Sequence, residues 1–354
     1  MNTWSPGVGG VLLTVLMVLA LSACGRIQVQ SAGAPIIQPV LADDHARMAD
    51  GYRLPLHRWE PREVSEAVIL GVHGFGDYGN AFAALSTLLD SESVTIYAYD
   101  QRGFGATDGQ GIWPGGDTLV GDLRTLATLL RGRHPDLPLY LVAESMGGAV
   151  ALRAITEAPG LDIDGVILLA PAVWGARVMP WYQRLGLWLL LRIAPGAMFS
   201  GDAVAHLGIR MTDDPDVLEA LRNDPLVQSR ARVDTLHGLT SLMGEALDHP
   251  PGFAQPTLVL YGLNDQVVPP SAVCAWFEHL LKLGAEQPRI VLYPEGFHLL
   301  TRYRQAANTG ADIAAWLDDP GSDLVVGEVV SVEEGKARVC GLPSPTRGSG
   351  ERGK

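Results

Sequence analysis

The chain has 354 residues, of which 47% are hydrophobic and 18% are charged, and its formal net charge is −13. This length is enough for one large core with an inserted subdomain. The acidic balance, with no block of Lys or Arg, argues against nucleic acid as a partner. Cys24, Cys274 and Cys340 form no C-x-x-C pair and no Cys/His cluster, so we expect neither a disulfide framework nor a zinc site.

The N-terminus carries a short apolar run that is typical of a targeting signal. Residues 11–23 are uncharged, and the run is too short for a comfortable transmembrane helix but suits a signal peptide. It ends in Leu21-Ser-Ala-Cys24-Gly25, which resembles the lipobox of bacterial lipoproteins. The resemblance implies that residues 1–24 hold a lipoprotein signal peptide with its lipobox, in which Cys24 becomes the first residue of the mature chain. It also implies that Cys24 is lipidated and anchors the protein to a membrane of the cell envelope, on its periplasmic or extracellular face.

Two alternatives stay open for this segment. No Lys or Arg precedes Val11, so a plain cleaved signal or an uncleaved N-terminal anchor fits the same residues. Residues 25–44 contain Gln, Ser, Gly and Pro, and we expect them to form a tether between the membrane and the folded part.

Short apolar runs alternate with helical patterns through most of the chain. An early antiparallel strand is expected at 51–59. Buried strands are expected at 67–73, 94–100, 139–143, 166–170, 257–261 and 289–293, and helices at 82–89 and 118–130. This order predicts the α/β class, with a mostly parallel central sheet and helices on both of its faces, over residues 45–171 and 251–318.

The rhythm changes between residues 172 and 250, where the sequence contains no convincing strand. Helical runs at 180–192 and 233–247 predict a helical cap inserted between two core strands. Trp181 and Trp188 belong to a helix that is more apolar than an exposed helix should be. These side chains could pack onto the core, dock on a membrane or line a channel for an acyl chain, and the sequence does not separate the three.

The last part of the chain, residues 319–354, is rich in Gly, Ser and charged residues. We expect a disordered tail, with a small ordered piece over 325–339 as the alternative.

Ser145 lies where an apolar strand runs into a small-x-Ser-x-Gly turn and then a helix. That context predicts a nucleophile elbow, in which Ala143 takes the place usually held by glycine. A serine that caps the helix is the alternative. Asp265 and His298 follow in the chain, and the order serine, acid, histidine is the one found in α/β-hydrolases.

These three residue types complement one another chemically. A serine hydroxyl is a poor nucleophile at neutral pH and needs a base, and the imidazole of His298 titrates in the right range. A buried carboxylate, Asp265, then fixes the imidazole tautomer and stabilises the imidazolium. The alternative for Asp265 is a turn-forming role. This chemistry needs no cofactor and no metal.

The negative oxygen of a tetrahedral intermediate needs backbone N–H donors. We assign one donor to Met146, directly after Ser145, and the other to Phe75 in the run His73-Gly-Phe75-Gly76 that follows a predicted strand. A tight turn made by the glycines is the alternative, and both can hold together. His73 is expected to support the loop rather than to transfer protons.

Five motifs together resemble the monoacylglycerol lipase/lysophospholipase family of α/β-hydrolases over roughly residues 45–318. They are His73-Gly-Phe-Gly-Asp-Tyr, Tyr99-Asp-Gln-Arg-Gly-Phe-Gly, Glu144-Ser-Met-Gly-Gly, Tyr261-Gly-Leu-Asn-Asp and Gly296-Phe-His.

The resemblance implies a Ser145–Asp265–His298 triad, with Phe75 and Met146 as oxyanion donors. It also implies hydrolysis of a small lipid ester, such as a monoacylglycerol or a lysophospholipid. Another activity on the same scaffold (general carboxylesterase, peptidase or haloperoxidase) and an inactive lipid-binding lipoprotein are the alternatives. No obligate protein partner is indicated.

Overall fold

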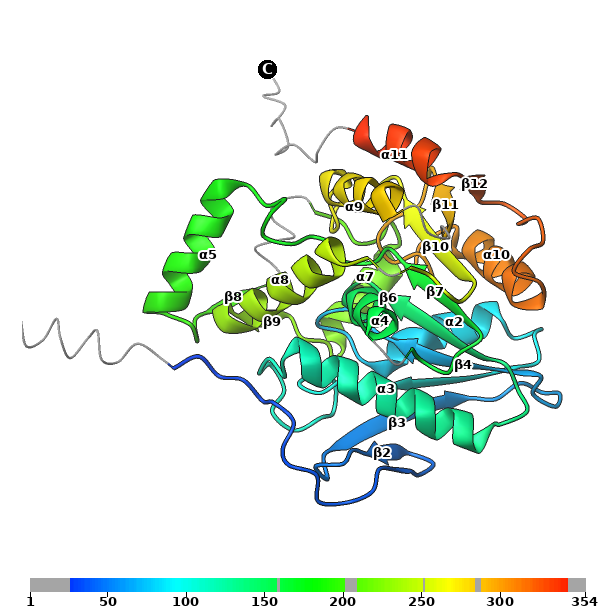
Figure 1. The fold of residues 1–354 in the computed structure, drawn as a ribbon, viewed down its shortest axis with the longest axis horizontal. Coiled ribbons are helices and arrows are strands. Elements are labelled where there is room, and N and C mark those ends of the chain that lie inside the picture. Colours follow the sequence, from blue (N-terminus) through cyan, green and yellow to red (C-terminus); the bar gives the residue numbers. More distant parts are fainter. Residues whose placement is uncertain (1–25, 158–159, 201–208, 251, 284–287, 343–354) are drawn as a thin grey trace, which may run out of the picture.

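Ten strands form one sheet in the part of the chain that the structure describes. The computed structural model describes residues 26–157, 160–200, 209–250, 252–283 and 288–342 (Figure 1). The strands lie in the order β1-β2-β3-β5-β4-β6-β7-β10-β11-β12. Non-consecutive neighbours in this order require crossovers, and helices supply them.

The central six strands pair in parallel. They are β4 (Ala67–Val72), β5 (Val94–Tyr99), β6 (Leu139–Glu144), β7 (Gly165–Leu169), β10 (Thr257–Gly262) and β11 (Arg289–Tyr293). Nearly all of their residues are buried, because helices cover both faces of a parallel sheet. The predicted buried strands and the predicted mostly parallel sheet are confirmed.

The edges of the sheet are antiparallel. On one side lie β1 (Val40–Leu41), β2 (His45–Arg47) and β3 (Arg53–Trp59), and on the other lies β12 (Glu328–Val330). β3 pairs antiparallel with β5, as the alternation at 51–59 predicts.

Alternate strand residues belong to two separate hydrophobic clusters, one on each face of the sheet. In β6, Leu139 and Leu141 belong to one cluster, and Tyr140 and Val142 to the other. The first cluster includes α3 (Gly116–Arg133), α4 (Met146–Thr156), α8 (Val233–Asp248), α9 (Pro270–Leu283) and α11 (Val332–Cys340). The second includes η1 (Gly79–Phe82), α2 (Ala83–Leu88) and α10 (Ala306–Asp318).

The insertion between β7 and β10 contains strands as well as helices. Its described elements are α5 (Trp181–Ile193), β8 (Met198–Ser200), α7 (Pro215–Asn223), β9 (Arg230–Arg232) and α8. The expectation of no strand is wrong here, because β8 and β9 pair antiparallel, and three residues are too few to show a period in the sequence. α8 packs into the core, whereas α5 has no buried residue and stands away from the sheet (Figure 1).

The described part of the expected tether, residues 26–44, lies against the fold, which corrects the expectation of a tether there. The backbone of Val29 bridges to Trp113, and the Gln28 N–H donates to Asp234 Oδ2 at 3.0 Å. The Gly33 N–H donates to Asp50 Oδ2 at 2.9 Å. A polar, Pro-containing composition does not reveal such bonds, because their partners are distant in the sequence.

The C-terminal segment corrects a second expectation. Residues 319–342 are ordered rather than a disordered tail: β12 pairs with β11, and α11 packs on α9. The buried carboxylate of Asp312 accepts hydrogen bonds from the N–H groups of Val325, Val326 and Gly327, which fixes the approach to β12. The remainder of the expected tail, 343–354, lies outside the described residues.

A disulfide joins Cys274 of α9 to Cys340 of α11, a pair that the sequence analysis, which expected no disulfide framework, did not identify. The two residues are 66 positions apart, and only the packing of α11 on α9 brings them together. Spacing rules for cysteines detect local pairs and miss such a pairing.

Within the described ranges, no helix has the length and apolar character needed to cross a membrane. The expected signal peptide and Cys24 lie outside the described residues.

Candidate active site

Ser145 occupies the turn between β6 and α4, in a backbone conformation that is rare for a residue with a side chain. Its φ is 54° and its ψ is −115°. Such strain costs about 1–3 kcal/mol and persists only where neighbours hold it. The Ser145 N–H donates to Leu169 O at 2.9 Å, and the Ala172 N–H donates to Ser145 O at 2.9 Å. These bonds to the end of β7 and the loop after it fix the elbow.

Small residues around the elbow allow strand and helix to approach each other. A Cβ added at Gly147 would lie 2.1 Å from Val72 O, and one added at Gly148 would lie 2.9 Å from Pro171. Ala143, by contrast, is fully buried in β6 opposite Val72 and Leu168. The sheet therefore accommodates the methyl group that departs from the usual glycine.

The structure brings together the three side chains that the sequence predicts. His298 Nε2 lies 2.9 Å from Ser145 Oγ, and His298 Nδ1 lies 2.8 Å from Asp265 Oδ2. The three residues follow β11, β6 and β10, and the carboxyl ends of parallel strands are where such sites assemble. The serine makes no side-chain cap hydrogen bond to α4, which removes the helix-cap alternative.

Asp265 is held in place by the loop that carries it. Its Oδ1 accepts hydrogen bonds from the N–H groups of Val267 at 2.7 Å and Val268 at 3.0 Å. The turn-forming alternative for Asp265 therefore holds as well, and it leaves Oδ2 directed at the imidazole of His298.

The surroundings of His298 favour its protonated form. Burial of the ring lowers its pKa, but the nearby Asp265 carboxylate, its hydrogen bond and the charge of Glu144 outweigh burial, so that the pKa is raised above its ordinary value. An imidazole with these neighbours can take a proton from Ser145 and hold it, which is what a general base in acyl transfer must do.

The loop after β4 lies directly against the elbow. A Cβ added at Gly74 would lie 3.2 Å from Ser145 Cβ, so Phe75 follows a residue in contact with the serine. Met146 begins α4, and the first N–H groups of a helix have no acceptor within the helix. Gly76 has a φ of 79°, and its carbonyl accepts from the Gln228 N–H at 2.7 Å.

His73 supports this loop, as predicted. Its ring is fully buried, with Nδ1 2.8 Å from Gly74 O and Nε2 accepting from the Gln101 N–H at 2.9 Å. Burial lowers the pKa of the ring, so it stays neutral.

One cluster at the site was missed by the sequence analysis. The guanidinium of Arg302, four residues after His298, lies between the carboxylates of Asp77 and Glu144. Asp77 is in the loop after β4, and Glu144 directly precedes Ser145. The sequence held no signal for this cluster, since the partners are separated by 225 and 158 positions from the arginine.

Potential metal ligands do not gather in this part of the molecule. Across the described residues, no group of three or more His, Cys, Asp or Glu side chains could hold a metal ion.

A parallel sheet with a strained serine after β6, an acid after β10 and a histidine after β11 is the arrangement of the α/β-hydrolase class. A family model described as "Serine aminopeptidase, S33" matches residues 63–304, and the chain belongs to this family of hydrolases.

Several relatives carry lipase names. The chain is 28% identical over 264 residues to a putative monoglyceride lipase of Schizosaccharomyces pombe. The match covers 72% of this chain and 66% of that protein, so this chain spans just under two thirds of its length. It is 23% identical over 273 residues to a monoacylglycerol lipase of Mycolicibacterium smegmatis, covering 75% of this chain and 93% of that one. The crystal structure of Paleococcus ferrophilus monoacylglycerol lipase shares the fold, with a TM-score of 0.62, 21% identity and coverage of 76% of this chain and 99% of that chain.

Proposed function

We propose that this protein is a serine hydrolase that cleaves the carboxylic ester bond of monoacylglycerols or lysophospholipids at a membrane surface. The observation that carries the proposal is the continuous chain of hydrogen bonds Ser145–His298–Asp265 at the carboxyl ends of β6, β11 and β10. The names of the relatives support a lipid ester as the substrate.

The geometry supports a reaction in two steps. Ser145 Oγ attacks the ester carbonyl carbon while its proton passes to His298 Nε2, and the oxyanion faces the N–H groups of Phe75 and Met146. The intermediate collapses to an acyl-serine, and the leaving alcohol takes the proton from His298. Water then attacks the acyl carbon, His298 accepts its proton and returns it to Ser145 Oγ, and the fatty acid leaves.

The cap carries an apolar pocket of a size that suits an acyl chain. Between α5 and α8 lies a pocket of about 500 Å³, whose lining includes Met179, Trp181, Leu185, Trp188 and Leu191. An aliphatic chain gains affinity in such surroundings.

An aminopeptidase is the alternative that the family description raises. Such an enzyme needs a free carboxylate for the ammonium group of its substrate. The carboxylates of Asp77 and Glu144, which flank the elbow, are both paired with Arg302. This pairing favours an ester without an ammonium group next to the scissile bond.

A substrate panel tests the activity. We expect the purified protein to hydrolyse monoacylglycerols and lysophospholipids of medium or long acyl length faster than an aminoacyl p-nitroanilide. Loss of all turnover in Ser145→Ala is the control for the site. Preference for the aminoacyl substrate would contradict the lipid assignment while leaving the triad in place.

We further propose that Cys24 is lipidated and holds the enzyme on the outer side of a membrane of the cell envelope. The disulfide between Cys274 and Cys340 supports an oxidising compartment. The described chain begins beside the cap, where Gln28 is bonded to Asp234 near the start of α8. The described chain therefore begins on the side of the molecule that carries α5 (Figure 1).

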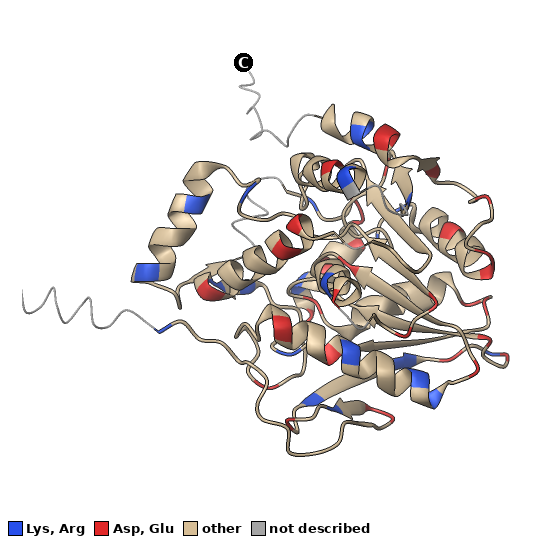
Figure 2. Ribbon diagram, in the orientation of Figure 1, with Lys and Arg blue, Asp and Glu red and all other residues tan. Residues whose placement is uncertain are grey.

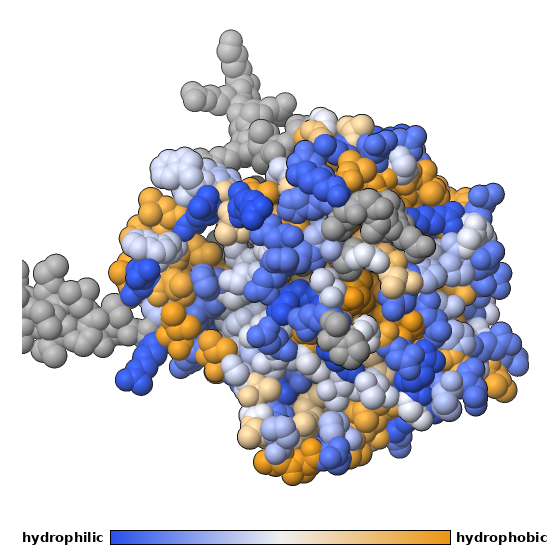
Figure 3. Space-filling model, viewed as in Figure 1, coloured by the Kyte–Doolittle hydropathy of each residue, from blue (hydrophilic) through white to orange (hydrophobic). Residues whose placement is uncertain are grey.

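The α5 surface suits this position. Trp181, Tyr182, Leu185, Trp188 and Ile193 are all exposed, and apolar side chains gather over α5 in Figure 3. Although the whole chain carries a net charge of −13, residues 165–201 contain three Arg and no acidic residue, and α5 shows only basic charges in Figure 2. Apolar and basic side chains together favour contact with an anionic lipid surface.

Mass spectrometry of the membrane fraction tests the anchor. We expect an N-terminal peptide that begins with a diacylated Cys24, and release of the Cys24→Ala protein from that fraction. An unmodified N-terminus at another residue would contradict the anchor without affecting the proposed activity.

A further inference from the structure

We propose that Arg302 is a positioning residue, whose guanidinium holds the loop that carries Phe75 and the turn that carries Ser145 in a fixed relation to His298. The inference deepens the proposed function and rests on it. Arg302 touches neither the serine nor the imidazole in the hydrogen bonds of the site, so it acts through the segments that it joins.

The arginine bridges the two segments by short contacts. Its Nη1 lies 2.7 Å from Asp77 Oδ2, and its Nη2 lies 2.6 Å from Glu144 Oε2. Asp77 closes the loop of Phe75, where its N–H donates to Gly74 O at 3.3 Å. Glu144 is the last residue of β6, directly before the strained elbow. One planar group therefore sets the spacing between the two predicted oxyanion donors.

The main chain of Leu299 and Arg302 binds the cap. Arg302 O accepts a hydrogen bond from Thr212 Oγ1 at 2.7 Å, and the Leu299 N–H donates to Met211 O at 3.0 Å. The short segment from His298 to Arg302 thus contacts the cap with its backbone and both site loops with one side chain.

The burial of this bridge argues against a role in stability alone. The side chains of Arg302, Asp77 and Glu144 are only 10%, 12% and 4% exposed. Arg302 Nε and Glu144 Oε1 are buried without a hydrogen-bond partner in the structure. Because a buried ion pair often stabilises no better than apolar residues of similar volume, its contribution here is the geometry that it imposes.

The bridge also sets the charge around the imidazole. The charged groups that act on His298 are Asp265 on one side and the Glu144–Arg302 pair on the other, with Asp77 beyond the arginine. The negative charge of Glu144 raises the pKa of His298, and the positive charge of Arg302 lowers it. Removing the charge of Arg302 alone must therefore raise that pKa, and removing the charge of Glu144 alone must lower it.

The test is the pH dependence of kcat/KM for a soluble p-nitrophenyl ester, measured for the full chain and two variants. Catalysis needs neutral His298, so the acid limb of the profile follows its pKa. We expect Arg302→Met to move the limb to higher pH, and Glu144→Gln to move it to lower pH, each by about half a pH unit or more. Arg302→Met should also lower kcat by about 10- to 100-fold, since the oxyanion donors lose their spacing.

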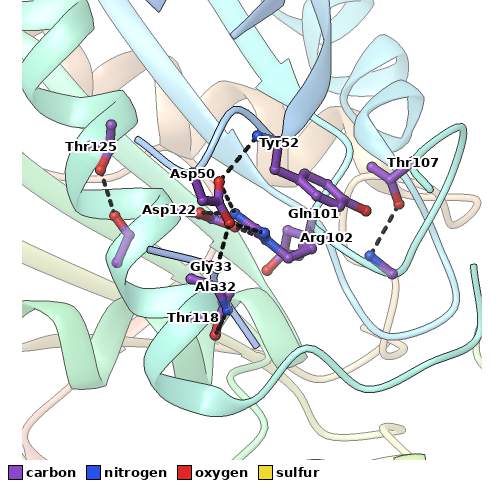
Figure 4. Close-up of polar contacts among 12 residues, drawn as sticks. Ala32, Gly33, Asp50, Tyr52, Gln101, Arg102, Thr107, Thr118, Asp122 and Thr125 are labelled. Carbon is purple, nitrogen blue, oxygen red and sulfur yellow. Dashed lines mark hydrogen bonds and ion pairs between the residues drawn. The ribbon is translucent and has the colours of Figure 1, made fainter. Parts of the chain in front are cut away.

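Two further variants separate positioning from folding. Arg302→Lys keeps the charge without the planar fork, so we expect the limb to stay in place while kcat falls. Arg102→Lys is the matched control, because Arg102 is a second buried arginine between two carboxylates that joins other segments (Figure 4). We expect Arg102→Lys to lower the unfolding midpoint in urea and to leave both the limb and kcat unchanged.

The inference would be overturned if the acid limb of kcat/KM does not move in Arg302→Met and Glu144→Gln. It would also be overturned if the limb moves in the same direction in both variants. If Arg302→Met does not fold by circular dichroism, the near-isosteric Glu144→Gln and Arg302→Lys decide by the same criteria. Turnover that persists in Ser145→Ala would instead overturn the proposed function, so the two failures are distinguishable.

Discussion

Two buried arginines in this molecule, Arg102 and Arg302, have the same immediate chemistry and hold different regions. Arg102 contacts Asp122 of α3 at 3.0 Å and Asp50 at 2.7 Å, and it lies 3.9 Å from the centre of the Tyr52 ring (Figure 4). Arg302 has the corresponding position between Asp77 and Glu144. The two arginines differ in which segments of the chain they join.

Around Arg102, those segments are structural. Asp50 also accepts hydrogen bonds from the N–H groups of Gly33 and Tyr52, so this cluster fastens the N-terminal segment to α3. None of the residues in this cluster belongs to the triad. The comparison teaches that a buried arginine between two carboxylates has no fixed role, and that its function follows from what its partners carry.

The strongest way to break this comparison is to remove the charge at Arg102. Loss of one partner from a buried ionic cluster leaves uncompensated carboxylates, so we expect Arg102→Leu to lower the free energy of unfolding by about 3–5 kcal/mol. Urea unfolding measures this loss. The acid limb of kcat/KM should stay in place in the folded protein, and a shift like that of Arg302→Met would show that the two clusters are not separate.

The disulfide is a third long-range link in this molecule, and unlike the two arginine clusters it is covalent. Cys274 and Cys340 close a loop over 66 positions. In the chain-entropy description such a closure stabilises the fold by about 4 kcal/mol, and measured values are often smaller. We expect the double variant Cys274→Ser/Cys340→Ser to lose up to this amount in urea unfolding, with kcat unchanged. A large loss of kcat would mean that α11 reaches the site.

A smaller effect is expected from the neutral variant Asp50→Asn, which keeps the shape of the side chain. Burial would raise the pKa of Asp50, but hydrogen bonds from Arg102, Gly33 and Tyr52 hold it below its ordinary value. We expect a loss of about 1–3 kcal/mol near neutral pH, typical of hydrogen bonds to a charged group.

The pH dependence gives the sign of this effect. A carboxylate with a depressed pKa stabilises the fold above its unfolded-state pKa, and that stabilisation is lost as the pH falls through the folded-state value. The difference between wild type and Asp50→Asn in urea unfolding should therefore shrink on acidification. A difference that stays constant would mean that shape, rather than charge, holds the N-terminal segment.

The sequence predicted that Ser145, Asp265 and His298 come together, because each of them lies on a local pattern. Ser145 follows a strand and precedes a helix, and Asp265 and His298 each follow an apolar run of strand length. Parallel strands bring their carboxyl ends to one edge, so three local patterns were enough to predict one site.

What the sequence analysis missed is non-local. Arg302 is separated by 225 positions from Asp77, and Cys274 by 66 from Cys340. Neither pair has a periodic pattern or a spacing rule. The order of residues 319–342 depends on β12 pairing with β11 and on α11 packing on α9, which composition does not reveal.

The most direct test of the central claim is the rate and position of labelling by a fluorophosphonate probe. We predict an adduct on the peptide that contains Ser145, and slowing of the reaction by at least about 10³-fold in His298→Ala, where the serine remains but its base is gone. An adduct on another serine, or an unchanged rate in His298→Ala, would contradict the account.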